Sequence, residues 1–241
     1  PLTRSVSDCA DALNIVSSHD QRDSTSVKAP FSDFGEGLEA GIADMNIGVP
    51  KEYLVGDIEP GVRSAFEVSL QVLEDLGANV VETSLPLTEH AIAVYYIIAP
   101  SEASANLSRY DGVKYGLGFT TAKTSAEATE LARAEGFGEE VKRRIFLGTY
   151  ALSAGYYDAY YKKAQQVRTL IRREFTDAFR EFDVLVTPTS PGVAFDIGEK
   201  VGDPFQMYLN DICTIPVNIA GLPSISVPGG MSDSLPVGLQ F

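Results

Sequence analysis

The order of apolar and polar residues predicts a strand, a helix and a second strand between residues 47 and 83. Residues 47–49 and 80–83 are short, mostly apolar runs, and Pro50 ends the first of them. Between them, apolar residues recur every three or four positions, and Gly77 follows as a helix-ending glycine. A strand–helix–strand unit of about 40 residues implies a parallel strand pair with a right-handed crossover. The predicted helix face consists of Val62, Phe66, Ser69, Leu73 and Leu76.

The same helical periodicity predicts further helices on both sides of this unit. A first helix is expected to begin at Ser7, and a loop follows over residues 20–38. An apolar helix over residues 89–107 contains Pro100, which is expected to interrupt or kink it. Residues 111–137 predict a loop and a short exposed helix, and the longest helix is predicted over about 150–182. The stripe of that helix consists of Tyr160, Ala164, Val167, Ile171, Phe175, Ala178 and Phe182.

Three strand candidates follow the longest helix. Residues 183–188 predict a buried strand stopped by Pro188, and residues 224–227 and 237–241 predict two more. We therefore predict an α/β fold in which helices cover both faces of a mixed sheet. Residues 1–241 are expected to belong to a single domain, with a mainly helical lobe at about 88–182.

Composition and charge narrow the class of function. The chain has 33 acidic and 19 basic residues, a formal net charge of −14, which disfavours direct binding to nucleic acid or to an anionic membrane. No apolar run approaches the length of about 20 residues that a membrane-spanning helix needs, and no signal peptide precedes the first helix. The two cysteines, Cys9 and Cys213, are interpreted as small core residues rather than zinc ligands. These features predict a reduced, cytoplasmic setting.

Both ends of the chain run into regular structure. The sequence begins at Pro1 directly before a predicted helix and ends at Phe241 inside a predicted strand. Natural termini usually taper into polar, mobile residues. We therefore expect this sequence to be a fragment of a longer protein.

Catalytic motifs are missing from the sequence. Hydrolysis of an amide by a side-chain nucleophile needs a neighbouring base and oxyanion donors. His19 is explained by the end of a helix, and His90 follows Glu89 near a helix start, so neither is assigned a catalytic role. Gly-x-Ser-x-Gly, phosphate-loop and dinucleotide-binding motifs are absent. No catalytic residue, metal site or cofactor is predicted in this chain.

Residues suited to recognising an amino acid are present. Tyr95 and its neighbour Tyr96 interrupt an aliphatic helix, and one of Arg143 and Arg144 should face inward and need an anionic partner. Asp211 lies in an apolar neighbourhood. Each charged residue alone is explained as a member of a structural ion pair, and the tyrosines as core residues with paired hydroxyls. Together, an arginine and an aspartate are also what binding a zwitterionic amino acid requires.

Several stretches resemble one family closely. The sequence is similar to the A subunits of bacterial-type glutamyl-tRNA(Gln)/aspartyl-tRNA(Asn) amidotransferases, within the amidase signature family, and corresponds to the C-terminal half. The resemblance covers nearly the whole chain. Its stretches are PLTRSV at 1–6, GVPKEY at 48–53, YYIIAPSEA at 95–103, NLSRYDG at 106–112, GFGEEVKRR at 136–144, LGTYALS at 147–153, YYDAYYKK at 156–163, and PVN with GLP between 216 and 223.

The resemblance implies a function and a set of partners. In this family the A subunit hydrolyses glutamine, and the ammonia passes to a B subunit that amidates ATP-activated glutamyl- or aspartyl-tRNA, using ATP and Mg²⁺. The implied partners are the B and C subunits, glutamine, and tRNA through the B subunit, with no membrane. The family's Ser–cis-Ser–Lys catalytic residues lie upstream of the stretch that matches Pro1, so the fragment alone is expected to be inactive.

The resemblance also implies site residues. The family's glutamine-binding tyrosine, arginine and aspartate match Tyr95, Arg144 and Asp211. Two alternatives stay open. One is another amidase-signature hydrolase that acts on small amides or amidated lipids, which would give no reason for the arginine and aspartate pair. The other is a non-catalytic interaction module, which would be supported if the natural gene had the same two ends.

Overall fold

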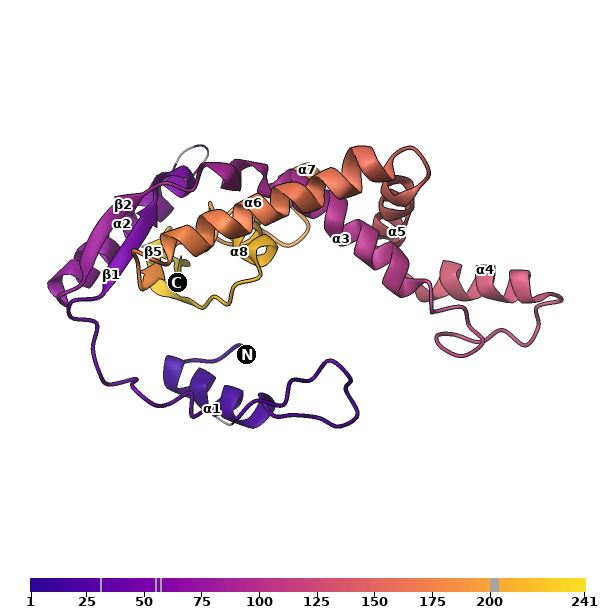
Figure 1. Cartoon of the computed structure of the whole chain (residues 1–241), viewed down its shortest axis with the longest axis horizontal. Coiled ribbons are helices and arrows are strands. Elements are labelled where there is room, and N and C mark those ends of the chain that lie inside the picture. The colour runs from indigo at the N-terminus through magenta and orange to yellow at the C-terminus, as the bar shows by residue number, and fades with distance from the viewer. Residues whose placement is uncertain (31, 55, 57, 200–203) are drawn as a thin grey trace.

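The computed structural model describes residues 1–30, 32–54, 56, 58–199 and 204–241 (Figure 1). Helices and strands alternate along the chain, in the order that follows. They are α1 (Val6–Val16), β1 (Asn46–Pro50), α2 (Pro60–Asp75), β2 (Asn79–Thr83), α3 (Ala91–Leu107), α4 (Ser125–Gly136), α5 (Glu139–Leu152), α6 (Lys163–Ala178), β3 (Val184–Leu185), β4 (Thr187–Pro188), α7 (Pro204–Leu209), α8 (Ile215–Ala220), β5 (Ser226–Ser232) and β6 (Leu235–Gln240). Shorter helical turns cover Lys51–Leu54 and Pro86–His90, and a π-helical turn covers Tyr157–Lys162.

The strands form two small sheets that share one segment of chain. β2, β1 and β3 make a parallel sheet, which confirms the predicted strand–helix–strand unit. β4, β6 and β5 make an antiparallel sheet. The single strand predicted over residues 183–188 is wrong in this respect, because Val186 separates β3 from β4. Its two ends have different neighbours: β3 pairs with β1, and β4 pairs with β6.

β5 and β6 form a hairpin that is longer than the two predicted strands. Ser232 pairs with Leu235, so only Asp233 and Ser234 lie in the loop. Both loop residues have positive φ, 48° and 65°, as a two-residue turn that matches the twist of its strands requires. This turn carries no glycine, which is why its sequence gives little signal of a hairpin.

Helices pack on both faces of the strands, as predicted. On one face, Phe66 of α2 is buried against Ile47 and Val186. On the other, Leu185 lies in a core built from α3, α6 and α8. Gly48 permits this second contact, since a Cβ atom there would lie 2.6 Å from Cδ2 of Leu185. The alternation of side chains along a strand thus separates two cores with the sheet between them.

The predicted helix over residues 150–182 begins too early. Residues up to 152 belong to α5, and the chain turns before the π-helical turn leads into α6. Gly155 adopts φ +89°, the left-handed conformation that commonly follows a helix end. The Ser153-Ala154-Gly155 sequence was the available signal for this break.

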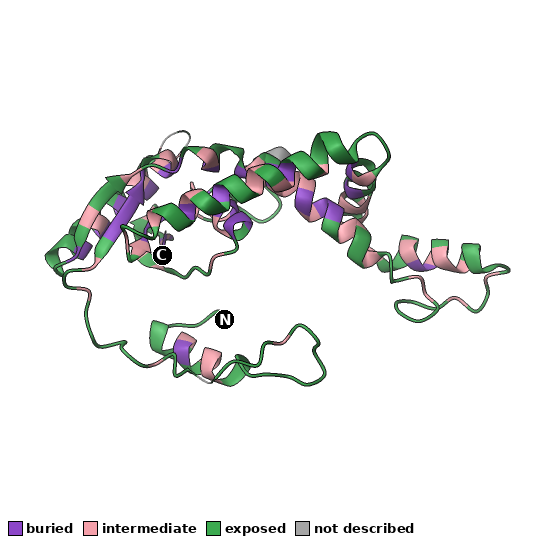
Figure 2. Cartoon of the chain, in the orientation of Figure 1, coloured by how far each residue is buried: buried purple, intermediate pink, exposed green. Residues whose placement is uncertain are grey.

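Two helices lie away from the sheets. α4 projects at one end of the molecule, and α1 lies apart from the strands (Figure 1). Both are largely exposed (Figure 2). The N-cap of α1 is Ser5, slightly earlier than the predicted Ser7, and Asn14 accepts a hydrogen bond from the backbone N–H of Phe34. Whether residues 88–182 form a separate lobe of a single domain stays a prediction. Within the described part of the chain, no helix has the length and apolar character to cross a membrane.

Candidate functional site

α3 and α5 lie side by side and bring two of the predicted site residues into contact. Nη1 of Arg144 on α5 donates a hydrogen bond to the hydroxyl of Tyr95 on α3, at 3.2 Å. The side chain of Arg144 is 31% exposed, whereas that of Arg143 is 50% exposed. Arg144 is therefore the arginine of this pair that faces the neighbouring helix.

A close backbone approach holds the two helices in this register. A Cβ atom on Gly148 would lie only 1.9 Å from the carbonyl oxygen of Pro100. One turn further along, the hydroxyls of Ser104 and Thr149 are 2.8 Å apart. The contacts advance in the same direction along both helices, so α5 runs alongside α3 in parallel. Gly148 lies one turn after Arg144, and its contact therefore sets the position of the arginine.

The anionic partner of Arg144 is Glu140, a residue that the sequence analysis did not single out. Oε1 of Glu140 accepts hydrogen bonds from Nε of Arg144 at 3.0 Å and from the hydroxyl of Tyr208 at 3.1 Å. Oε2 pairs with Arg143. Burial acts to raise the pKa of Glu140, but the hydrogen bonds and both guanidinium charges outweigh it, so the pKa lies below its usual value. The four-residue spacing of Glu140 and Arg144 was the signal in the sequence.

Asp211 lies in the turn between α7 and α8, beside this cluster. Its N–H donates to the carbonyl of Tyr208 at 3.2 Å, and its own carbonyl accepts from the N–H of Ile215 at 2.9 Å. The residue is exposed, yet partial burial of its carboxyl raises the pKa, while the charge of Arg144 acts to lower it. The interpretation of Asp211 as a buried ion-pair partner is therefore wrong: among the described residues, Arg144 pairs with Glu140.

Aromatic rings connect the three elements. The rings of Tyr96 and Tyr208 stack at 4.3 Å between centroids, and Tyr95 meets Tyr96 edge-on at 5.0 Å. The expectation that both tyrosine hydroxyls are paired holds for Tyr95, but the buried hydroxyl of Tyr96 has no hydrogen-bond partner among the described residues. Burial raises the pKa of Tyr96, with a further contribution from the negative charge of Asp211. The phenol therefore stays neutral beside the charged groups.

The charges of the cluster suit a zwitterion. Arg143 and Arg144 carry two positive charges against one negative charge on Glu140, which leaves one positive charge on this side. Asp211 carries one negative charge on the other side. An α-carboxylate and an α-ammonium group carry the complementary pair. The arrangement can therefore hold a free amino acid by its two charged ends.

Two hollows occur elsewhere, each of about 500 Å³. The first lies where the end of α6 meets the sheet, and its lining, which includes Phe175 and Phe179, is mainly apolar. The second borders the turn before α8 at Ile212 and Cys213. Neither is lined by Tyr95 or Arg144. We base the candidate site on the polar contacts, because an apolar hollow gives no reason to select a ligand.

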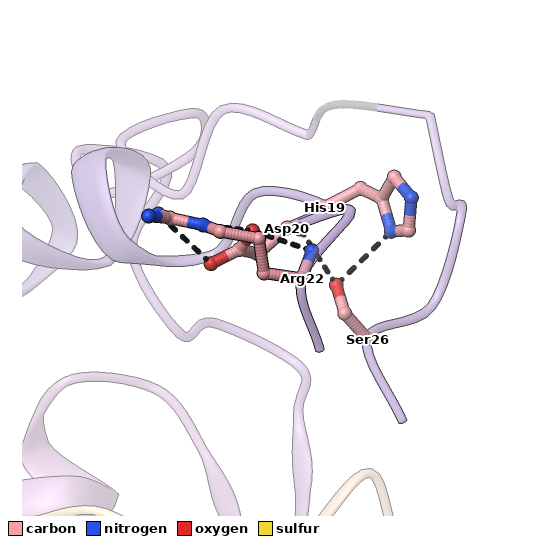
Figure 3. Close-up of polar contacts among 4 residues, drawn as sticks. All are labelled: His19, Asp20, Arg22 and Ser26. Atoms are coloured by element: carbon pink, nitrogen blue, oxygen red, sulfur yellow. Dashed lines mark hydrogen bonds and ion pairs between the residues drawn. The ribbon is translucent and has the colours of Figure 1, made fainter. Parts of the chain in front are cut away.

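The histidines do not form a catalytic group in the described structure. Nδ1 of His19 lies 3.1 Å from Oγ of Ser26, which superficially resembles a nucleophile and base (Figure 3). Oγ of Ser26 also accepts from the N–H of Asp20, and the Asp20 carboxylate binds Arg22 instead of the imidazole. All four residues are exposed, and His19 lies beyond the end of α1. His90 contacts only Glu89, at 3.5 Å.

The cysteines and acidic residues show no metal site within the described ranges. Cys213 is fully buried in the core, as predicted, and burial raises the pKa of its thiol to about 12. Cys9 is half-buried, and both cysteines are free thiols. In the part of the chain that the structure covers, no three His, Cys, Asp or Glu side chains come together as metal ligands would.

Comparison with known proteins identifies relatives over the whole chain. A family model described as Amidase matches residues 1–241. The A subunit of glutamyl-tRNA(Gln) amidotransferase from Dehalococcoides mccartyi (strain CBDB1) is 56% identical over 242 residues, which cover 100% of this chain and 50% of the relative. The equivalent protein from Chloroflexus aggregans is 55% identical over 241 residues, covering 100% and 49%. The chain thus spans about half the length of the curated relatives it matches.

Solved structures give the same picture. The crystal structure of the glutamyl-tRNA(Gln) amidotransferase A subunit from Thermotoga maritima matches with a TM-score of 0.73 and 43% identity, covering 99% of this chain and 47% of that one. A bacterial aryl acylamidase of the amidase signature family matches with a TM-score of 0.72 and 22% identity, over 99% and 47% of the two chains. The second likeness establishes the fold alone.

Proposed function

Because the chain belongs to the amidase family over its full length, we propose that it forms the glutamine-recognising part of a tRNA-dependent amidotransferase. The complete A subunit hydrolyses glutamine, and the complex converts Glu-tRNA(Gln) or Asp-tRNA(Asn) to Gln-tRNA(Gln) or Asn-tRNA(Asn). The observation that carries this proposal is the placing of Arg144 against Tyr95, with Asp211 on the neighbouring turn. Relatives that are amidotransferase A subunits, at 56% and 43% identity, support the choice of substrate.

Each residue has a role that follows from its chemistry. Arg144 binds the α-carboxylate of glutamine, because a guanidinium matches a carboxylate with two parallel hydrogen bonds. Asp211 binds the α-ammonium group, and Tyr95 holds Nη1 of Arg144 in place. With both charged ends fixed, the side-chain amide of glutamine extends away from the cluster towards the residues that hydrolyse it.

The remaining parts of the reaction are proposed to come from outside these 241 residues. The family's Ser–cis-Ser–Lys group would belong to the rest of the full-length protein, which agrees with the chain spanning about half of its relatives. A B subunit would use the ammonia together with ATP and Mg²⁺, a C subunit would complete the cytoplasmic complex, and tRNA would bind through the B subunit. On this proposal the 241-residue chain alone does not hydrolyse glutamine.

Replacing Arg144 by alanine in the full-length protein, in complex with its partners, tests the proposal. We expect the KM for glutamine to rise about 100-fold, because removing one member of a hydrogen-bonded charge pair costs about 2–5 kcal/mol. Amidation of tRNA with free ammonia should be unchanged. Arg143→Ala is the matched control, since this neighbouring arginine is more exposed and makes no contact with Tyr95 in the described structure. An unaltered glutamine KM in Arg144→Ala would refute the carboxylate-binding role.

A further inference from the structure

We propose that Glu140 is a positioning residue: it orients Arg144 towards the substrate carboxylate and, through Tyr208, fixes the spacing between Arg144 and Asp211. The inference rests on the proposed function and extends it to two residues outside the trio. It also gives a role to the short helix α7, which otherwise contributes no charged group to the site.

The guanidinium geometry is the first step. An arginine side chain has five N–H donors in one plane. Glu140 takes the Nε donor of Arg144, and Tyr95 takes one donor of Nη1. One hydrogen on Nη1 and both on Nη2 have no partner among the described residues. These atoms form one edge of the fork, so a carboxylate can accept two parallel hydrogen bonds there without displacing Glu140 or Tyr95.

The link to Asp211 is the second step. Oε1 of Glu140, which binds Arg144, also accepts the hydroxyl of Tyr208 at 3.1 Å. Tyr208 belongs to α7, and its carbonyl accepts the N–H of Asp211 at 3.2 Å. Its ring stacks on Tyr96, next to Tyr95 in α3. One carboxylate oxygen therefore ties α5 to the turn that carries Asp211, and it does so between the cationic and the anionic halves of the site.

The charge of Glu140 is the third step, because a carboxylate beside a substrate carboxylate would ordinarily repel it. Arg143 shares this charge through the other oxygen, Oε2, so that two guanidinium groups surround one carboxylate. The lowered pKa of Glu140 keeps it ionised near neutral pH. The cluster retains a net positive charge for the ligand, and Glu140 stays as a fixed acceptor.

The test uses three ligands that differ only in their charged ends. Glutamine carries both ends, glutaramate lacks the α-ammonium group, and 4-aminobutanamide lacks the α-carboxylate. The KM for glutamine and the inhibition constants of the two analogues are measured for the full-length protein in its complex. The variants are Glu140→Ala, Glu140→Gln and Tyr208→Phe, with Arg144→Ala for reference.

Glu139→Ala is the matched control. This adjacent glutamate pairs with Lys142 and has no contact with Arg144 in the described structure. The Glu140→Gln variant keeps an oxygen that can accept from Arg144 and Tyr208 but lacks the charge. Tyr208→Phe removes the hydroxyl and keeps the ring that stacks on Tyr96. These two variants retain most of the packing and keep the test decisive even where alanine disturbs folding.

A loss confined to ligands with a carboxylate is the expected result. Glu140→Ala should weaken glutamine and glutaramate about tenfold, because a hydrogen bond to a charged group is lost, and should leave 4-aminobutanamide within about twofold. Glu140→Gln should recover most of the affinity. Tyr208→Phe should weaken glutamine, which spans both halves of the site, more than either analogue. Glu139→Ala should match the parent for all three ligands.

Two results would overturn the inference while the proposed function stands. Equal weakening of all three ligands by Glu140→Ala and Glu140→Gln would show a purely structural role. Tighter glutamine binding in Glu140→Ala would show that Glu140 competes with the substrate for Arg144. If Arg144→Ala itself weakened 4-aminobutanamide as much as glutamine, the proposed function would fail instead.

Discussion

The region around α2 and the region around α5 are stabilised in different ways. Phe66 of α2 is only 1% exposed and lies with Ile47 and Val186 in a wholly apolar core. On α5, Arg144 and Glu140 are partly open to solvent, and their positions depend on hydrogen bonds and on the close approach at Gly148. Apolar burial is non-directional, whereas hydrogen bonds and backbone contacts fix particular atoms. The first region therefore supplies stability, and the second supplies geometry for a ligand.

Replacing Phe66 by alanine should have the largest effect on stability. The free energy of unfolding should fall by about 3–5 kcal/mol, because the change removes a buried ring and leaves a cavity. Denaturant titration of the chain measures this loss. Val68→Ala, on the same helix at 62% exposure, should change stability by less than about 0.5 kcal/mol. Equal losses in the two variants would contradict the assignment of this core.

Replacing Gly148 by alanine should affect stability less and the site more. The added methyl group would meet the carbonyl of Pro100, so α5 must shift away from α3, at a cost of about 1–3 kcal/mol. The shift separates Arg144 from Tyr95, and the glutamine KM of the assembled enzyme should rise. Gly138→Ala is the control: it lies at the start of α5 with no atom within 4 Å of an added Cβ, and should cost less than about 1 kcal/mol. A destabilised Gly148 variant with an unchanged KM would separate helix packing from ligand geometry.

Asp211→Asn should produce the smallest change in stability, and with the opposite sign. The pKa of Asp211 is raised, so its stabilising protonated form is present at low pH and is lost as pH rises through that pKa. At neutral pH the ionised carboxylate is a cost, although Arg144 offsets part of it. The asparagine variant should therefore melt slightly higher than the parent at pH 7, with a difference that shrinks towards pH 4, and should bind glutamine more weakly.

Glu140→Gln sharpens this contrast within the site. The pKa of Glu140 is lowered, so its contribution to stability is present above the ordinary glutamate pKa of about 4.3 and is lost as pH falls through the folded value. Glu140→Gln should therefore melt lower than the parent at pH 7. Melting temperatures of the parent and both variants at several pH values measure the two signs. Shifts of the same sign at pH 7 would show that the two carboxylates do not differ in this way.

Much of the fold was predictable because it depends on local periodicity. The β1–α2–β2 unit, the apolar helix through Pro100 and the exposed helix α4 all follow from the spacing of apolar residues. The division of residues 183–188 between two sheets was not predictable, because it depends on β1 and β6, which are distant in sequence. The break before α6 had a local signal in Gly155, but the apolar stripe on either side of it masked that signal.

The candidate site shows the same limit. The sequence suggested an inward-facing arginine, and the structure places Arg144 against Tyr95. The expected partner Asp211 is replaced by Glu140, because a carboxylate one helical turn away is already in reach before any tertiary contact forms. The link through Tyr208 requires α7 to pack beside α5, and nothing in the local sequence indicates that contact.

The sequence by itself determined which residues carry charge and which faces of the helices and strands are apolar, because these properties depend on residue type and short spacing. It therefore determined the α/β pattern and the presence of a tyrosine, an arginine and an aspartate suited to an amino acid. Only the tertiary structure decided which carboxylate holds Arg144, how α3 and α5 align at Gly148, and where Asp211 lies. Those features depend on distances between segments far apart in the chain, such as the 68 positions between Glu140 and Tyr208, and such distances are set by packing.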